Sequence, residues 1–255
     1  MIVTRLLSCR RSFGTSSSQL TSSSVAAAAG KLYEDHIPLS ALQKAILTVG
    51  SGVTAILDPY RHDLVADFGE TTGHEALKWM HSKMSADTEG RRVLADKPRL
   101  RSDRIDYKHL GELPENTFGY QYSRFYIDNK VSPDTRKIVQ FVDDAELAYV
   151  MQRYRELHDV VHTILSQPTT IKGEVIVKAF EGVQTRLPLC ILGGLIGPVR
   201  LSFGELAQYL RRDLPWALRC GRESKFLMST YFEDRWEQDI TELRRELNIN
   251  LQANH

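Results

Sequence analysis

The chain has 255 residues, of which 33 are basic and 32 acidic, so its formal net charge is only +1. This balance argues against a strongly basic binding surface, and no nucleic acid is expected as a partner. A chain of this length, with 42% hydrophobic residues, is long enough to bury the core of one large domain.

The first thirty residues have the composition of a mitochondrial transit peptide. They contain Arg5, Arg10 and Arg11, no acidic residue, and a Ser-rich stretch that leads into a run of alanines. We therefore predict a transit peptide over residues 1–30 and a single domain over residues 31–255, the alternative being a disordered tail. The two cysteines of the domain lack paired ligand spacing and are expected to be buried and reduced.

The first half of the domain contains several segments with helical patterns. Apolar residues recur at helical spacing from Pro38 to Leu57, where Asp58-Pro59 ends the run. The apolar stretch in this segment is too short to cross a bilayer, and its face would serve either core packing or contact with lipid. Helices are also predicted at 73–84 and 89–95. Residues 100–129 have the glycine, proline and aromatic content of an extended loop with a short strand pair.

The second half of the domain also predicts helices, so the expected fold is all-α. Ser132-Pro133-Asp134 is a favourable helix opening, and Asp143-Asp144 places acids at the positive end of a long helix. A second helix is predicted from about Thr170 to Arg186, and the glycine-rich stretch up to Pro198 suits close helix packing or contact with a prenyl chain. Further helices are predicted at 202–212, 215–226 and 231–247.

The long helix carries His158, Asp159 and His162, a pattern typical of metal ligands. Each helical residue advances by about 100°, so the two histidines lie about 40° apart with Asp159 on the adjoining edge. Pro168 breaks the helix, and His162 and Glu174 stand six residues either side of it. In an antiparallel helix pair these four side chains would meet in a metal-binding helical hairpin. Two imidazoles and two carboxylates suit zinc, and also manganese or ferrous iron.

Two other interpretations of this pattern stay open. The same residues would suit a solvated helix face, with His162 packed at its margin. A phosphohydrolase of the HD type also begins from a His-Asp pair, but it needs further ligands, for which His74 or His81 would have to serve. Glu181 follows Glu174 by seven residues, so it lies on nearly the same helix face and is expected to orient a ligand.

Several longer motifs occur in order between Lys31 and Ile249. They are Ser132-Pro133-Asp134-Thr135-Arg136, Phe141-Val142-Asp143-Asp144, Glu146-Leu147-Ala148-Tyr149-Val150 with Gln152-Arg153-Tyr154-Arg155-Glu156, His158-Asp159-x-x-His162-x11-Glu174, Gly197-Pro198 and Pro215-Trp216-Ala217. Together they resemble the mitochondrial coenzyme Q (ubiquinone) biosynthesis protein 4 family.

This resemblance implies an all-helical protein bound peripherally to the matrix side of the mitochondrial inner membrane. It implies a multi-subunit complex with other ubiquinone-biosynthesis proteins, contact with the inner-membrane lipid surface, and binding of polyprenylated benzoate and quinone intermediates. It also implies a zinc-type site at His158, Asp159, His162 and Glu174, although another divalent metal would fit these ligands.

The family is associated with removing the C1 carboxylate of 4-hydroxy-3-methoxy-5-polyprenylbenzoate to give 2-methoxy-6-polyprenylphenol. An oxidative version that hydroxylates the same carbon is the alternative. The resemblance therefore implies a metal-dependent carboxy-lyase, a decarboxylase that also organises the biosynthetic complex. The competing hypothesis is a non-catalytic, lipid-binding scaffold that presents prenylated intermediates to partner enzymes.

Overall fold

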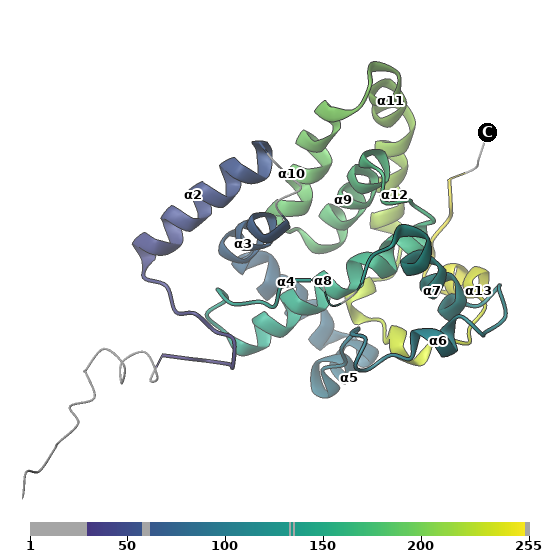
Figure 1. Cartoon of the computed structure of the whole chain (residues 1–255), viewed down its shortest axis with the longest axis horizontal. Coiled ribbons are helices and arrows are strands. Elements are labelled where there is room, and N and C mark those ends of the chain that lie inside the picture. Colours follow the sequence, from purple (N-terminus) through teal and green to yellow (C-terminus); the bar gives the residue numbers. More distant parts are fainter. Residues whose placement is uncertain (1–29, 58–61, 133, 135, 253–255) are drawn as a thin grey trace, which may run out of the picture. The chain divides into compact units, whose positions relative to one another are not determined.

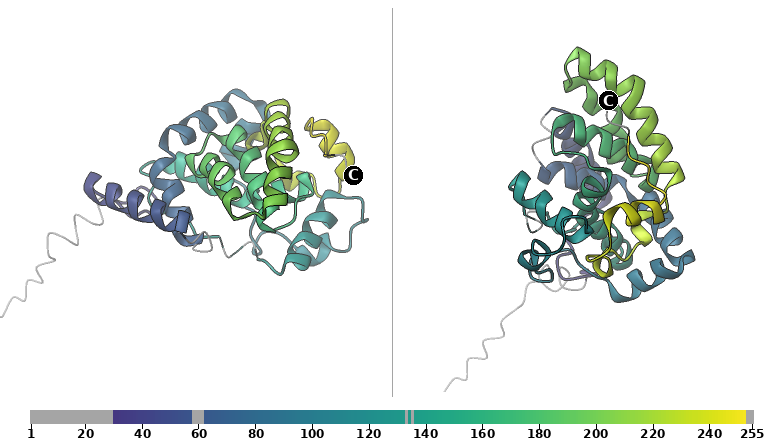
Figure 2. Two further views of the ribbon diagram at one scale, coloured as in Figure 1. Left: turned by 90° about the horizontal axis from the view of Figure 1, so that it is seen from above. Right: turned by 90° about the vertical axis from the view of Figure 1, so that its right-hand side faces the viewer.

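The helix α8 (Ala145–Leu165) lies at the centre of the fold. In the computed structural model, which describes residues 30–57, 62–132, 134 and 136–252, every residue from Leu147 to Leu165 is buried. Figures 1 and 2 show the other helices arranged around α8. The predicted start of this helix is confirmed, because the side chain of Asp144 accepts the backbone N–H of Leu147 at 2.9 Å.

Among the described residues the regular structure is helical, and the β-pairing is one isolated bridge between Thr117 and Asp239. This confirms the all-α prediction. The helices before α8 are α2 (Ala41–Leu57), α3 (His62–Thr72), α4 (His74–Ala86), α5 (Thr88–Asp96), α6 (Tyr107–Leu110) and α7 (Phe118–Asn129). Those after it are α9 (Ile171–Thr185), α10 (Pro188–Ile196), α11 (Phe203–Gln208), α12 (Leu214–Glu223) and α13 (Ile240–Glu246). Short 3-10 turns at Gly197–Arg200, Leu227–Ser229 and Phe232–Asp234 and a π-helical segment at Tyr209–Asp213 complete the chain.

Charged side chains of α8 are buried because each has a partner on a surrounding segment. Arg155 pairs with Glu70 of α3 at 2.7 Å, and Arg153 pairs with Glu233 near the C-terminus. Glu156 accepts a backbone N–H at 2.9 Å from the segment that follows α5. A buried charge left alone would be strongly unfavourable, so these pairs fix where the surrounding segments lie on α8.

The prediction of an extended loop at 100–129 is wrong over Tyr107–Leu110, which form α6, and over most of its second half, which forms α7. Thr117 caps this helix by accepting the N–H of Tyr120. Phe118, Tyr122 and Phe125 recur at helical spacing and are buried, so the aromatic cluster is the core-facing side of a helix. These aromatic side chains are therefore core residues.

Two of the predicted helices are also corrected. Residues 136–144 are not helical; the backbone N–H groups of Gln140 and Phe141 donate to Glu70 instead of to a helix. The helix predicted at 231–247 is shortened to α13, because Asp239 caps a new helix start after a 3-10 turn.

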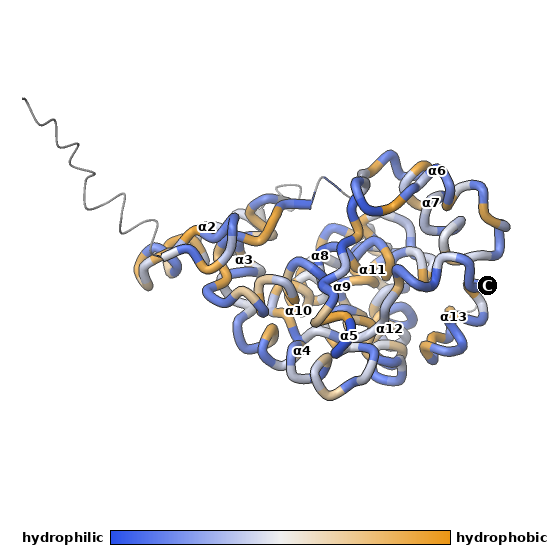
Figure 3. The backbone as a smooth tube through the Cα atoms, turned by 90° about the horizontal axis from the view of Figure 1, so that it is seen from below, coloured by the Kyte–Doolittle hydropathy of each residue, from blue (hydrophilic) through white to orange (hydrophobic). Residues whose placement is uncertain are grey.

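The apolar face of α2 points to solvent rather than into the core. Leu42, Ile46, Val49 and Val53 are each more than half exposed, and Figure 3 shows the apolar colour along this helix. The opposite side packs on α3, where Gly52 lies against Phe68. The core-packing interpretation of these four residues is therefore wrong.

None of the described helices combines the length and the apolar content that a membrane crossing requires. The predicted transit peptide lies at residues 1–30, of which 1–29 are outside the described residues. The rest of the chain from Leu32 onward groups into one compact unit.

Candidate metal centre

His158 and His162 project from the same side of α8 and are almost completely buried. Their ring centroids lie 4.7 Å apart, as the four-residue spacing predicts. The Nδ1 atom of His158 lies 2.7 Å from Oε1 of Glu181, and Nδ1 of His162 donates to the carbonyl oxygen of Gln167 at 3.0 Å. Both Nδ1 atoms are thus engaged on the far side of the rings, which leaves both Nε2 atoms facing the same point.

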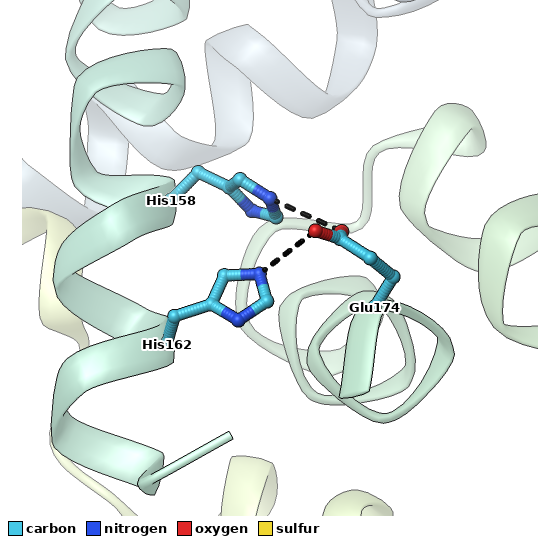
Figure 4. A group of neighbouring side chains, drawn as sticks. All are labelled: His158, His162 and Glu174. Atoms are coloured by element: carbon cyan, nitrogen blue, oxygen red, sulfur yellow. Dashed lines mark ion pairs between the residues drawn. The ribbon is translucent and has the colours of Figure 1, made fainter. Parts of the chain in front are cut away.

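Glu174 faces these two nitrogens from the first turn of α9. Its Oε2 lies 3.4 Å from Nε2 of His158, and its Oε1 lies 3.3 Å from Nε2 of His162 (Figure 4). Thr170 caps the helix through the N–H of Gly173. Figure 4 shows α9 nearly end-on where α8 lies in the plane, so the helices cross steeply and are not the antiparallel pair that was expected.

The arrangement of these three side chains fits a cation between them. The Nε2 atom of His162 is buried and makes no hydrogen bond. Because Nδ1 carries the ring proton, a neutral His162 presents a lone pair at Nε2 toward a carboxylate oxygen of Glu174. Two hydrogen-bond acceptors this close repel each other unless a proton or a metal ion lies between them. One ligand atom from each of His158, His162 and Glu174 lies within 4.8 Å of the others, as a shared ion requires.

The electrostatics of the cluster favour a charged Glu174. Burial alone would raise the pKa of Glu174, but His158 and His162 outweigh it and hold that pKa far below its usual range. Burial and Lys178 act to lower the pKa of His158, yet Glu181 and Glu174 raise it above its ordinary value. The carboxylate therefore stays ionised and able to act as a ligand.

A buried network supports His158 from behind. Lys178 donates to Oε2 of Glu181 at 2.7 Å and lies 3.1 Å from Nδ1 of His158. Tyr154 donates to the same carboxylate at 3.1 Å and contacts Cys190 at 3.0 Å. Burial raises the pKa of Cys190 to about 12, so this thiol stays protonated. The expectation that Glu181 orients a histidine agrees with this geometry.

Asp159 is not part of the group that converges on Glu174. Its Oδ1 pairs with Arg136, and its Oδ2 accepts the hydroxyl of Tyr126 at 2.8 Å. That hydroxyl in turn lies 3.0 Å from the hydroxyl of Tyr122. Although Asp159 is next to His158 in the sequence, both of its oxygens are occupied by groups outside the histidine cluster.

The structure does not support the two other interpretations of the motif, a solvated helix face and a phosphohydrolase of the HD type. Glu156 and Asp159 are each 3% exposed, so the solvated-face interpretation is wrong. His74 is exposed and near Glu75 on α4, and neither His74 nor His81 joins the ligand group found among the described residues. The geometry therefore gives the phosphohydrolase interpretation no additional ligands.

Comparison with known proteins gives the family. Residues 33–253 match the family model described as coenzyme Q (ubiquinone) biosynthesis protein Coq4. The chain belongs to the Coq4 family. This confirms the resemblance and associates the chain with the biosynthesis of ubiquinone.

Curated members of the Coq4 family are similar over most of their length. The chain is 54% identical over 221 residues to the mitochondrial ubiquinone biosynthesis protein COQ4 homologue of Danio rerio, covering 86% of this chain and 81% of that one. It is 49% identical over 227 residues to the mitochondrial homologue of Homo sapiens, covering 89% of this chain and 86% of the relative.

A crystal structure has the same fold. A protein of Nostoc punctiforme, provisionally assigned to ubiquinone biosynthesis, superposes with a TM-score of 0.64 at 19% identity, covering 81% of this chain and 98% of that chain. At this identity the likeness concerns the fold alone.

Sequence reasoning did not identify several polar residues around the centre of this Coq4-family chain. Tyr154 precedes His158 by four residues and Lys178 follows Glu174 by four, so helical spacing could have found both. Arg136 lies in a loop, and no local spacing connects it to Asp159.

Proposed function

We propose that the chain is a metal-dependent decarboxylase that removes the C1 carboxylate of 4-hydroxy-3-methoxy-5-polyprenylbenzoate to give 2-methoxy-6-polyprenylphenol. Membership of the Coq4 family supports the pathway. The convergence of two buried imidazole nitrogens and a carboxylate, one nitrogen without a hydrogen bond, is the observation that supports a metal site.

His158, His162 and Glu174 would hold the metal, and zinc is the first choice. Two imidazoles and one carboxylate are a ligand set that catalytic zinc sites use, leaving a position for substrate. When bound, the ion supplies Lewis-acid stabilisation of negative charge on an oxygen of the substrate. Glu181 and the carbonyl of Gln167 orient the two rings for this role.

The balance of charges around the histidines also fits an anionic substrate. Three carboxylates, Asp159, Glu174 and Glu181, accompany two cations, Arg136 and Lys178. With neutral imidazoles this leaves about one excess negative charge, which a divalent ion reverses. A loaded centre would therefore attract a benzoate, whereas the unloaded centre would repel it.

The proposed reaction needs one proton and no oxidant. The ring carbon C1 accepts the proton, and the ring becomes a dienone because the para oxygen gives its electrons to the ring. The bond between C1 and the carboxylate carbon then breaks, its electrons restore the aromatic ring, and carbon dioxide leaves. Solvent is the candidate source of this proton, because Glu174 stays ionised in the cluster and would be engaged as a metal ligand.

Exposed apolar residues support binding at a lipid surface, which a polyprenyl chain would require. One such face lies on α2, and a second runs from α10 into α11, where Phe203 is 89% exposed. The other strongly exposed apolar residues of this second face are Leu195 and Val199. Because exposed apolar residues mark interaction sites, we propose that both faces contact a membrane surface, which the family resemblance implies is the matrix side of the mitochondrial inner membrane.

The decarboxylase proposal is tested with purified protein and a short-chain prenylated substrate. His158→Ala and Glu174→Ala should lose bound zinc and lower carbon dioxide release by at least about a hundredfold, because charge stabilisation by a metal contributes several kcal/mol. His74→Ala removes an exposed histidine and should leave both unchanged. Unchanged carbon dioxide release by the two centre variants would end the proposal.

The scaffold hypothesis remains a second candidate, because the exposed apolar faces serve a carrier of prenylated intermediates equally well. Variants of His158 that fold normally but release no carbon dioxide separate the two roles. If other ubiquinone-biosynthesis proteins still co-purify with such variants, the organising role is independent of the metal centre.

A further inference from the structure

Arg136 places a positive charge at the edge of the histidine cluster. Its guanidinium pairs with Oδ1 of Asp159, the residue that follows His158 on α8. One third of the Arg136 side chain is exposed, whereas the Asp159 side chain is almost fully buried. Glu174 is among the charges that act on Arg136. Arg136 is therefore the member of this ion pair that reaches the solvent, and its charge is close enough to act on Glu174.

Asp159 is built to hold this arginine in place. Both of its oxygens are engaged, one by Arg136 and the other by the hydroxyl of Tyr126 at 2.8 Å. Burial raises the pKa of Tyr126, so its hydroxyl remains a neutral donor. Tyr126 itself is fixed by Tyr122, which is fully buried in the aromatic cluster of α7. A rigid chain of contacts thus runs from the core to the guanidinium.

A guanidinium has more donors than this ion pair uses. The contact with Asp159 involves the Nη2 atom of Arg136, and the group carries N–H donors on two further nitrogens. The planar fork of these donors matches the two oxygens of a carboxylate. An arginine held from one side by a buried carboxylate is therefore prepared to bind a second carboxylate from the other.

We propose that Arg136 binds the carboxylate of the prenylated benzoate and that Asp159 is the positioning residue for this arginine. The inference rests on the proposed function, because it names the group of the substrate that each part of the centre recognises. In this arrangement Asp159 supports Arg136 and does not bind the metal. A metal held by His158, His162 and Glu174 would then be left to stabilise charge on a different oxygen of the substrate.

The reaction itself predicts how this contact affects the kinetics. The carboxylate loses its negative charge as carbon dioxide forms, so an ion pair with Arg136 is stronger in the bound substrate than in the transition state. Such an interaction lowers KM and does not raise kcat. Loss of Arg136 should therefore raise KM by about tenfold to a hundredfold, the effect of one charge-assisted contact, and should leave kcat unchanged or increase it.

A binding experiment tests the proposal independently of turnover. The full chain, loaded with zinc, is titrated with 4-hydroxy-3-methoxybenzoate carrying a short 5-prenyl group, and with the corresponding 2-methoxy-6-prenylphenol, which lacks the carboxylate. Arg136→Ala should weaken binding of the benzoate about tenfold to a hundredfold and leave phenol binding within about twofold. Arg136→Lys should fall between the two, because it keeps the charge without the fork.

The controls separate this role from a structural one. Arg124→Ala removes an exposed arginine that is also paired with an aspartate, Asp128 at 2.6 Å, and should change neither affinity. Asp159→Asn should weaken benzoate binding while the protein retains its zinc, measured by elemental analysis. Zinc loss from Asp159→Asn would overturn the positioning role and make Asp159 a ligand.

Failure of the inference is distinguishable from failure of the proposed function. Equal affinity of wild type and Arg136→Ala for the benzoate would overturn the inference, and so would an equal loss of affinity for both ligands. A wild-type protein that prefers the benzoate through Arg136 but releases no carbon dioxide would retain the binding role and reject the decarboxylase.

Discussion

The Nδ1 atom of His158 and the Oε1 atom of Glu181 lie 2.7 Å apart, and both side chains are buried. This contact joins α8 to α9 and turns Nε2 of His158 toward Glu174. A carboxylate behind a histidine fixes the ring and increases the basicity of the opposite nitrogen. The relationship between these two residues therefore determines how well the centre can bind a metal.

Glu181→Gln is expected to lower zinc affinity by about tenfold to a hundredfold, because the neutral amide no longer polarises His158. Zinc binding is measured by competition with a chelator of known affinity, and circular dichroism checks the fold. Glu75→Gln changes an exposed carboxylate on α4 and is the matched control. Equal affinities for wild type and Glu181→Gln would show that the contact does not affect the metal.

The affinity for zinc should decrease as the pH falls, because protons compete for Nε2. Burial and Lys178 lower the pKa of His158, but Glu181 and Glu174 raise it above the ordinary value of 6.5. The affinity for zinc should therefore begin to fall once the pH drops below the raised pKa of His158. The decrease should be up to about tenfold per pH unit for each proton that zinc displaces. Titrations from about pH 5 to about pH 8 measure this slope. A flat profile would contradict protonation at His158.

The stability of the metal-free protein should depend on pH in the opposite sense. Because the folded-state pKa of His158 is raised, its stabilisation is complete below the unfolded value of 6.5 and is lost as the pH rises through the folded pKa. Zinc stabilises the folded state most at high pH, where protons compete least for the histidine nitrogens. The difference in Tm between zinc-loaded and metal-free protein should therefore grow with pH. A difference that shrinks with rising pH would contradict this linkage.

Gly173→Ala is expected to displace the start of α9 and with it Glu174. A Cβ at Gly173 would lie 1.9 Å from the carbonyl oxygen of Pro168, so the backbone would have to move. We expect a loss of about 1–3 kcal/mol in the free energy of unfolding, together with weaker zinc binding. Gly50→Ala on α2 is the control, because a Cβ there meets nothing within 4 Å. Equal effects of the two substitutions would refute the steric argument.

Phe203→Glu is expected to weaken binding to phospholipid vesicles at least about tenfold, because a buried aromatic side chain contributes about 1.5–3 kcal/mol. Co-sedimentation with vesicles that contain an anionic phospholipid measures the effect. Ile127→Glu changes an apolar residue of α7 that is 58% exposed, and it should have little effect. If both variants bind vesicles as wild type does, the face from α10 to α11 is not a lipid-binding surface.

The sequence by itself determined the local part of the centre. Four residues separate His158 and His162, so any helix places both rings on one side, and Asp144 caps the start of that helix. The placement of Glu174 shortly after the Pro168 break could also be predicted, because the connection between the helices is too short to carry it far away.

Only the tertiary structure decided how these helices cross and what surrounds the ligands. The steep crossing of α8 and α9, the turn of Asp159 toward Arg136, and the outward apolar face of α2 depend on packing between distant segments. The sequence predicts a loop where α7 forms, because the glycine and proline before its aromatic residues dominate the local pattern. Spacing along a helix follows from covalent geometry, whereas the partner of a buried charge is selected by the packing of the whole domain.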